Sequence, residues 1–172
     1  MHLDALEKMG ANFELDHGVL IGKTDGLNGV EINLPYASVG ATENTLLAAV
    51  LAKGRTVIEN AAREPEIVDI VNMLLKMGAN ISGAGTSEII IEGVDKLNPT
   101  DHEIIGDRIA AGTFLAAILS TKGSGIVNGI NPEHLPMELK KLGEMGAKID
   151  STETSINIEY RDNLQSIELS TL

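Results

Sequence analysis

Residues 74–79, with the sequence Leu-Leu-Lys-Met-Gly-Ala, have close counterparts at residues 6–11 and 142–147. The offset is the same in both directions (74 − 6 = 142 − 74 = 68). A second segment, Thr-Leu-Leu-Ala-Ala-Val-Leu at residues 45–51, matches Thr-Phe-Leu-Ala-Ala-Ile-Leu at residues 113–119 with the same offset. Two separate segments that share one period indicate that the chain is built from a repeated structural unit.

The two repeated segments predict two kinds of helix. In the middle copy of the first segment, Val68, Val71 and Leu74 lie on one helical face, and Gly78 follows the expected end of the helix. Glycine is common there because it adopts positive φ at little cost. The second kind of segment, at residues 45–52 and 113–119, is apolar nearly all round, which predicts helices that are buried on all sides.

Short β-branched or alternating runs separate these helices and predict strands at residues 30–34, 56–60, 87–92, 125–128 and 155–159. The predicted unit is a strand, a buried helix, a strand, an amphipathic helix and a strand pair, which makes the chain an α/β protein. Residues 1–26 then form the tail of an incomplete unit, residues 27–99 a complete unit and residues 100–172 a second one. A unit that starts part-way favours truncation of a longer chain. A native start with a decayed first unit is the alternative.

The composition narrows the possible classes of function. Lys and Arg number 13 against 25 Asp and Glu, and the resulting net charge of −12 argues against binding to nucleic acid or to a membrane surface. The chain contains no Cys, which excludes a disulfide framework within it and fits a cytoplasmic protein. No leader or membrane-spanning run is evident. None of the four His residues shows metal-ligand spacing, so no metal site is expected.

Residues 38–44 (Ser-Val-Gly-Ala-Thr-Glu-Asn) are the first candidate for a binding site. They lie between a predicted strand and the buried helix expected from about Thr45. Their small side chains leave backbone N–H groups exposed at a helix N-terminus, which suits a phosphate or another anion. An ordinary helix cap, with Ser38 or Thr42 as the N-cap residue, is the alternative.

Two charged segments are further candidates. Residues 60–66 (Asn-Ala-Ala-Arg-Glu-Pro-Glu) lie between a strand end and a helix start, although helix-dipole preferences alone also place carboxylates there. Residues 107–113 open the second buried helix, where Asp107 and Arg108 form either a simple ion pair or a functional one. In contrast, the Gly-Ala-Gly of residues 83–85 precedes a strand, which indicates a hairpin turn rather than a dinucleotide-binding loop.

These motifs in series give the chain a strong resemblance to a known family. The sequences Ser-Val-Gly-Ala-Thr at residues 38–42, Glu-Asn-Ala-Ala-Arg-Glu-Pro-Glu-Ile-Val-Asp at residues 59–69, Ser-Gly-Ala-Gly-Thr at residues 82–86 and Asp-Arg-Ile at residues 107–109 resemble the UDP-N-acetylglucosamine 1-carboxyvinyltransferases of the enolpyruvyl transferase family. The second of these is highly specific to that family. The resemblance extends along almost the whole chain.

The resemblance implies a fold and a reaction. Members have two domains, each an inside-out α/β barrel of three repeated units with buried helices inside and sheets outside. They transfer the enolpyruvyl group of phosphoenolpyruvate to the 3-hydroxyl of UDP-N-acetylglucosamine, the first committed step of peptidoglycan synthesis. Neither a metal nor an organic cofactor is needed. By this resemblance, the hinge between the two domains falls near residues 105–106, so residues 27–99 and 100–172 belong to different domains of a longer protein.

The resemblance also assigns residues. The family residues that contact uridine diphosphate correspond to Ser38, Val39 and Gly40, together with the two preceding residues, Tyr36 and Ala37. Some members have Lys where Tyr36 stands. In the family, one carboxylate faces the cleft between the two domains, and it corresponds to Glu64. The charged pair just past the hinge corresponds to Asp107 and Arg108. Many members have Glu where this chain has Ala110, which removes one cleft carboxylate. The positions of this chain that match functional positions of the family are Tyr36, Ala37, Ser38, Val39, Gly40, Glu64, Asp107 and Arg108.

Other groups of the family are expected outside this chain. The Lys-Asn pair, the loop with the reactive Cys and the Arg after it correspond to positions before Met1. The aspartate that acts as the base and the arginines that bind phosphoenolpyruvate correspond to positions after Leu172. The expectation is a catalytically inactive piece with a partial nucleotide-sugar site that self-associates through its open helices. A non-catalytic module that binds a nucleotide sugar or a partner protein is the alternative.

Overall fold

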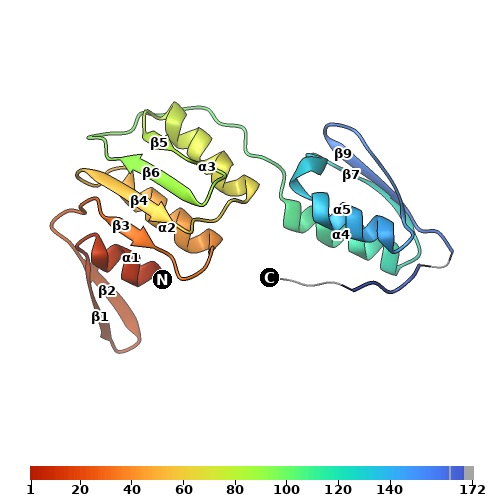
Figure 1. Ribbon diagram of the computed structural model, residues 1–172, viewed down its shortest axis with the longest axis horizontal. Coiled ribbons are helices and arrows are strands. Elements are labelled where there is room, and N and C mark those ends of the chain that lie inside the picture. The colour runs from red at the N-terminus through yellow and green to blue at the C-terminus, as the bar shows by residue number, and fades with distance from the viewer. Residues whose placement is uncertain (163, 169–172) are drawn as a thin grey trace. The chain divides into compact units, whose positions relative to one another are not determined.

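The computed structural model describes residues 1–162 and 164–168 (Figure 1). Contacts along the chain divide it into two compact units, Met1–Glu103 and Ile104–Leu172. This division lies a few residues after the predicted limit of the repeat unit at residue 99, and just before the predicted hinge. The assignment of the two units to different domains of a longer protein stays a prediction. The predicted unit at 100–172 includes residue 163 and residues 169–172, which lie outside the described residues.

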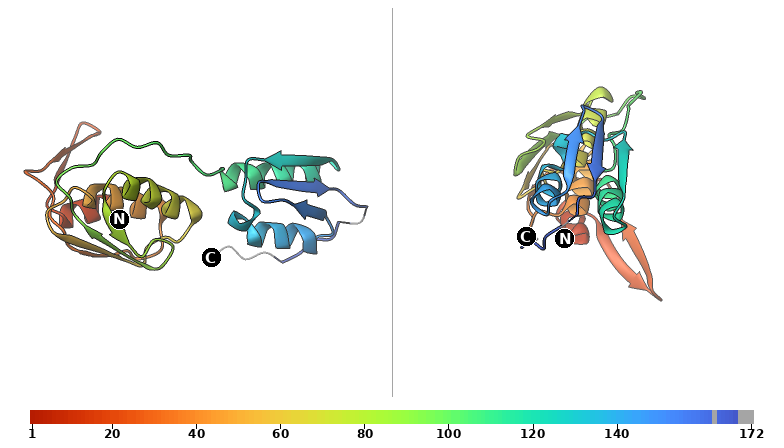
Figure 2. Two further views of the ribbon diagram at one scale, coloured as in Figure 1. Left: turned by 90° about the horizontal axis from the view of Figure 1, so that it is seen from above. Right: turned by 90° about the vertical axis from the view of Figure 1, so that its right-hand side faces the viewer.

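The first unit has the predicted order of elements. After a helix and a hairpin come a strand, a helix, a strand, a helix and a strand pair. The elements are α1 (His2–Lys8), β1 (Asn12–Asp16), β2 (Val19–Lys23), β3 (Glu31–Asn33), α2 (Val39–Ala49), β4 (Arg55–Glu59), α3 (Pro65–Lys76), β5 (Asn80–Ser82) and β6 (Glu88–Glu92). The last four strands form one sheet in the order β3-β4-β6-β5, in which only β3 and β4 are parallel. Helices α2 and α3 pack along this sheet (Figure 2).

The glycines of the repeated motif act as predicted. Gly10, Gly78 and Gly146 follow the ends of three helices and have φ values of 107°, 97° and 106°. A side chain at such a backbone angle would be strained, so these glycines end each amphipathic helix and start the next strand. The predicted hairpin turn at residues 83–85 is also confirmed, because β5 and β6 pair antiparallel across it.

The second unit lacks the first strand of the predicted order. Its elements are α4 (Arg108–Ser120), β7 (Ser124–Asn128), η1 (Pro132–His134), α5 (Pro136–Glu144), β8 (Lys148–Ser151) and β9 (Ser155–Glu159). The strands form an antiparallel sheet in the order β7-β9-β8. Among the described residues, no strand lies between β6 and α4, so the prediction of a strand there was wrong. Residues 93–98 instead hydrogen-bond to the first unit, through the amides of Gly93, Val94 and Asn98.

The two apolar helices are buried on one face only. In α2, Leu46 is buried while Leu47 is 45% exposed, and in α4, Leu115 is buried while Phe114 is 62% exposed. The expectation of helices buried on all sides was therefore wrong for this chain. The expectation that both helices leave apolar side chains open is confirmed for Leu47, Leu51 and Phe114 and wrong for the buried Leu46, Val50, Leu115 and Leu119.

The first hairpin lacks a neighbour that its two counterparts have. In the three hairpins, Gly22, Ile91 and Ile158 hold equivalent positions, opposite Phe13, Ile81 and Ile149. Two residues before them lie Leu20, Ile89 and Ile156. Ile89 and Ile156 are fully buried, but Leu20 is 49% exposed. Strands β6 and β9 are each paired on their other edge, with β4 and β7, whereas among the described residues β2 pairs only with β1. This difference agrees with an incomplete unit at residues 1–26, which stays a prediction.

Within the part of the chain that the structure describes, no helix has the length and apolar character needed to cross a membrane.

Candidate functional site

Helix α2 begins earlier than predicted. Its first residue is Val39 rather than about Thr45, because Ser38 caps it and small residues continue the helix from there. The Ser38 hydroxyl accepts a hydrogen bond from the Ala41 amide at 3.3 Å. The first candidate segment is therefore the cap and first turns of α2, which matches the alternative of a helix cap. The amides of Val39 and Gly40, at the first two helical positions, are free of intrahelical partners by the geometry of a helix start.

A buried hydroxyl joins this helix start to the second candidate segment. Thr42 is fully buried, and its hydroxyl donates to the Ser38 carbonyl at 2.8 Å and accepts from the Ala62 amide at 3.0 Å. The Asn60 side chain donates to the Leu34 carbonyl at 2.9 Å, and Asn60 itself has a positive φ of 56°. Because β3 and β4 are parallel, the segments after both strands meet at the same edge of the sheet. These bonds hold the two segments together.

An open hollow of about 400 Å³ lies beside these segments and is lined by Ala37, just before the first segment, and by Asn60, Ala61, Arg63 and Glu64 of the second. It brings together two residues that the resemblance assigned, Ala37 and Glu64. The Glu64 carboxylate accepts a hydrogen bond from the Arg63 amide at 2.8 Å and caps α3 only by its position, because its side chain bonds no helical amide. The exposed Arg63 adds a positive charge beside the Glu64 carboxylate; the sequence analysis included Arg63 in the candidate segment 60–66, but the resemblance assigned it no role.

The other assigned residues of the first unit lie beside the hollow. Tyr36 is exposed, and Val39 and Gly40 are partly buried in the first turn of α2. Gly40 faces α1, because a Cβ at this position would lie 3.2 Å from the His2 ring. The His2 ring also contacts the Asn44 side chain at 2.6 Å. The close packing of α1 on α2 therefore favours a small residue at position 40.

Asp107 and Arg108 belong to the second unit and do not line the hollow. Asp107 is the N-cap of α4, and one carboxylate oxygen accepts hydrogen bonds from the amides of Ile109 at 2.8 Å and Ala110 at 3.0 Å. Arg108 is the first residue of α4 and is partly buried. This geometry gives Asp107 a structural role in addition to the assigned one. Its role and that of Arg108 in a substrate site stay predictions.

No metal centre was expected, and none is proposed here. Among residues 1–162 and 164–168, no group of three or more His, Asp or Glu side chains could hold a metal ion.

Replacing Thr42 by Val is expected to destabilise the first unit by about 1–3 kcal/mol, because it leaves the buried Ala62 amide without its acceptor. The matched control is Thr45→Val. The Thr45 hydroxyl is also buried, but it only donates to the Ala41 carbonyl of its own helix, so a smaller loss is expected. Urea unfolding of both variants measures the difference. Equal losses would show that the Thr42–Ala62 bond does not hold the two segments together.

Comparison with known proteins gives the class to which this fold and site belong. The sequence model of the family described as EPSP synthase (3-phosphoshikimate 1-carboxyvinyltransferase) matches residues 1–172. The chain therefore belongs to the EPSP synthase family of enolpyruvyl transferases.

Individual relatives carry a more specific name than the family as a whole. The chain is 48% identical over 172 residues to the UDP-N-acetylglucosamine 1-carboxyvinyltransferase of Corynebacterium jeikeium, covering all of this chain and 41% of that protein. It is 49% identical to the enzyme of the same name from Nocardia farcinica, covering all of this chain and 40% of the relative. The chain thus spans about two fifths of the length of these relatives.

Solved structures confirm the predicted fold class. The enolpyruvyl transferase NikO from Streptomyces tendae superimposes with a TM-score of 0.80 at 23% identity, covering 93% of this chain and 41% of that one. EPSP synthase from Acinetobacter baumannii gives a TM-score of 0.64 at 23% identity, covering 98% of this chain and 41% of that one. At this identity the likeness concerns the fold alone.

Proposed function

We propose that this chain is a piece of the enzyme that transfers enolpyruvyl from phosphoenolpyruvate to the 3-hydroxyl of UDP-N-acetylglucosamine, in peptidoglycan synthesis and in the cytoplasm. The names of relatives at 48% and 49% identity support this substrate pair. The structural observation that supports it best is the hollow beside the start of α2, where Ala37 and Glu64 meet. The acidic, cysteine-free composition also suits an intracellular enzyme.

In this proposal, the start of α2 binds the diphosphate. The amides of Val39 and Gly40 point out of the first turn, and the positive end of the helix dipole favours an anion there. Ser38 caps the turn and so fixes the direction of these amides. Tyr36 and Ala37 flank the uridine end of the nucleotide. Together they form a partial site for UDP-N-acetylglucosamine.

Three charged residues complete the proposed assignment. Glu64 supplies a carboxylate at the hollow, and Asp107 and Arg108 supply the charged pair of the second unit. The site for phosphoenolpyruvate is mostly missing, because the arginines that the family uses for it have no counterpart in the sequence of this chain. No metal or organic cofactor enters the proposal.

Calorimetric titration tests the nucleotide site. UDP and UDP-N-acetylglucosamine are expected to bind weakly and about equally, because the proposed contacts are to the uridine-diphosphate end. Ala37→Glu is expected to weaken both by at least about tenfold, since a carboxylate in the hollow repels the diphosphate. Leu75→Glu, an exposed position on the far part of α3, is the control and is expected to leave binding unchanged. A strong preference for phosphoenolpyruvate would contradict the proposal.

Self-association is a second part of the proposal. The exposed apolar side chains of Leu47, Ile109 and Phe114 lie on α2 and α4, and that of Leu51 lies just after α2; exposed apolar surface of this kind usually binds a partner. The chain is expected to scatter light with a mass above 18.2 kDa at micromolar concentration. Replacing Phe114 by Ser is expected to lower that mass. A monomeric wild-type chain would show that these side chains do not drive association.

The alternative function is a non-catalytic module that binds a nucleotide sugar or a protein. The absence of Cys from the sequence and the coverage of about two fifths of the relatives are compatible with it. Turnover by a longer protein that contains this chain would separate the two, because a non-catalytic module predicts none.

A further inference from the structure

The segment that follows β6 is attached to the rest of the first unit at several points. The Val94 amide donates to the Val50 carbonyl at 2.9 Å, and the Asn98 amide donates to the Met77 carbonyl at 2.8 Å. Leu97, between them, packs against the core of the first unit. We call residues 93–102 the strap. By the 68-residue repeat its last part corresponds to β3, but the strap pairs with no strand among the described residues.

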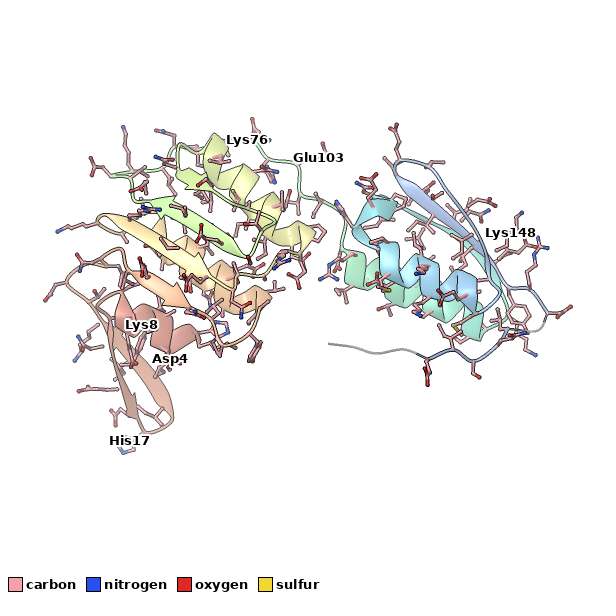
Figure 3. The ribbon with its side chains drawn as sticks, viewed as in Figure 1. Asp4, Lys8, His17, Lys76, Glu103 and Lys148 are labelled. Atoms are coloured by element: carbon pink, nitrogen blue, oxygen red, sulfur yellow. The ribbon has the colours of Figure 1, made fainter. Side chains whose placement is uncertain are left out.

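The strap ends at a partly buried histidine, His102. The His102 Nε2 atom lies 3.0 Å from a carboxylate oxygen of Asp69, and the two side chains are only 8% and 14% exposed. The Lys76 ammonium group lies 3.5 Å from the His102 Nδ1 atom. Asp69 and Lys76 are both on α3, so His102 bonds two turns of one helix. Figure 3 labels Lys76 near the end of α3 and Glu103, the residue after His102.

The donors and acceptors of this cluster define one arrangement. An ammonium group can only donate, so Nδ1 accepts from Lys76 and Nε2–H donates to the Asp69 carboxylate. Both ring nitrogens are then satisfied. Without the imidazole, the Asp69 carboxylate would remain mostly buried without this donor, which is costly. The site proposed above does not include any of these three residues.

The chain is unattached directly after His102. Glu103 is exposed and Ile104 is 77% exposed, and the boundary between the two compact units falls between them. The next fixed point is Gly106, which packs so closely on the Gly129 carbonyl that a Cβ would not fit. Asp107 then caps α4. Residues 103–105 therefore lie between two attached points, His102 on the first unit and Gly106 on the second.

We propose that His102 is a latch that ends the strap and confines the joint between the two units to residues 103–105. Bonding to Asp69 and Lys76 makes the strap part of the first unit. The joint then starts at a fixed point on α3, the helix that begins directly after Glu64 of the hollow. The joint ends at residue 105, the first of the two residues at which the family resemblance places a hinge. This inference concerns the attachment of the strap and holds whether or not the chain binds a nucleotide sugar.

Hydrogen exchange of the full chain tests the latch through the Asn98 amide. In His102→Ala, this amide is expected to exchange about tenfold to a hundredfold faster than in wild type, the equivalent of losing a hydrogen bond to a charged group. In His102→Gln, whose side-chain amide can still donate to Asp69, a smaller increase is expected. His17→Ala removes an exposed His that contacts Asp16, and it is expected to change nothing at Asn98.

Two results would overturn the proposal. One is an unchanged Asn98 exchange rate in His102→Ala. The other is an equal acceleration at Asn98 and at the core residue Ile89, which would make His102 a contributor to the stability of the whole unit rather than a latch. Limited digestion by a protease of broad specificity gives a second readout. Cleavage is expected at residues 103–105 in wild type and additionally at 94–102 in His102→Ala, and an identical pattern in both would also overturn it.

Discussion

No phosphate release above background is expected when the purified 172-residue chain is incubated with UDP-N-acetylglucosamine and phosphoenolpyruvate. The chain contains no Cys, so it cannot supply the reactive Cys that the family resemblance implies. It also covers only 41% of the relative from Corynebacterium jeikeium. Removing a single positioned group that stabilises a transition state can lower the rate about 10²–10³-fold. The loss of several such groups together leaves no measurable turnover.

The assay needs a positive and a negative control. The complete enzyme of Corynebacterium jeikeium, assayed in parallel, shows that the conditions support the reaction. Omitting UDP-N-acetylglucosamine gives the background release of phosphate. Release that rises in proportion to the concentration of the purified chain would contradict the expectation and would mean that the essential groups lie within these residues.

The substitution Leu115→Ala is expected to unfold the second unit and leave the first one folded. Leu115 is fully buried in a core with only a few other buried side chains, among them Leu135, Ile156 and Ile158. Truncating a buried Leu to Ala typically costs about 2–5 kcal/mol, which is a large share of the stability of a small domain. The amides of Ile156 and Ile158 are expected to lose protection from hydrogen exchange.

The neighbouring residue provides the matched control. Phe114 is 62% exposed on the same helix, so Phe114→Ala is expected to change the stability of the second unit by less than about 1 kcal/mol. In both variants, the amide of Ile89 in the first unit is expected to keep its protection. Loss of protection at Ile89 in Leu115→Ala would show that the two units do not unfold independently.

Features that depend on residues close together in the chain could be predicted from the sequence. The three glycines with positive φ, the strands β4, β6, β7 and β9 and the hairpin turn at residues 83–85 all follow from local patterns. The start of α2 was misplaced because Val39 and Gly40 are weak helix formers, and a Ser38 cap overrides their propensity.

Features that depend on distant residues could not be predicted. The hollow requires the Thr42 hydroxyl to accept from the Ala62 amide, 20 positions along the chain. The contact of His102 with Asp69 spans 33 positions, and neither residue has a local pattern that points to the other. Helix faces were predicted as buried because an all-apolar sequence does not reveal which neighbours are present in this chain. Leu47 of α2 is an example: its sequence context predicts a buried side chain, but the side chain is exposed.

We propose that the start of α2 and the loop after β4 together form the nucleotide-binding surface of this chain. Backbone amide chemical shifts, followed while UDP is titrated into the full chain, test it most directly. Saturable changes are expected at residues 37–41 and 60–64, with smaller changes elsewhere in the first unit. The proposal would be contradicted by saturable changes that spare both segments, or by the same changes at both segments in Ala37→Glu.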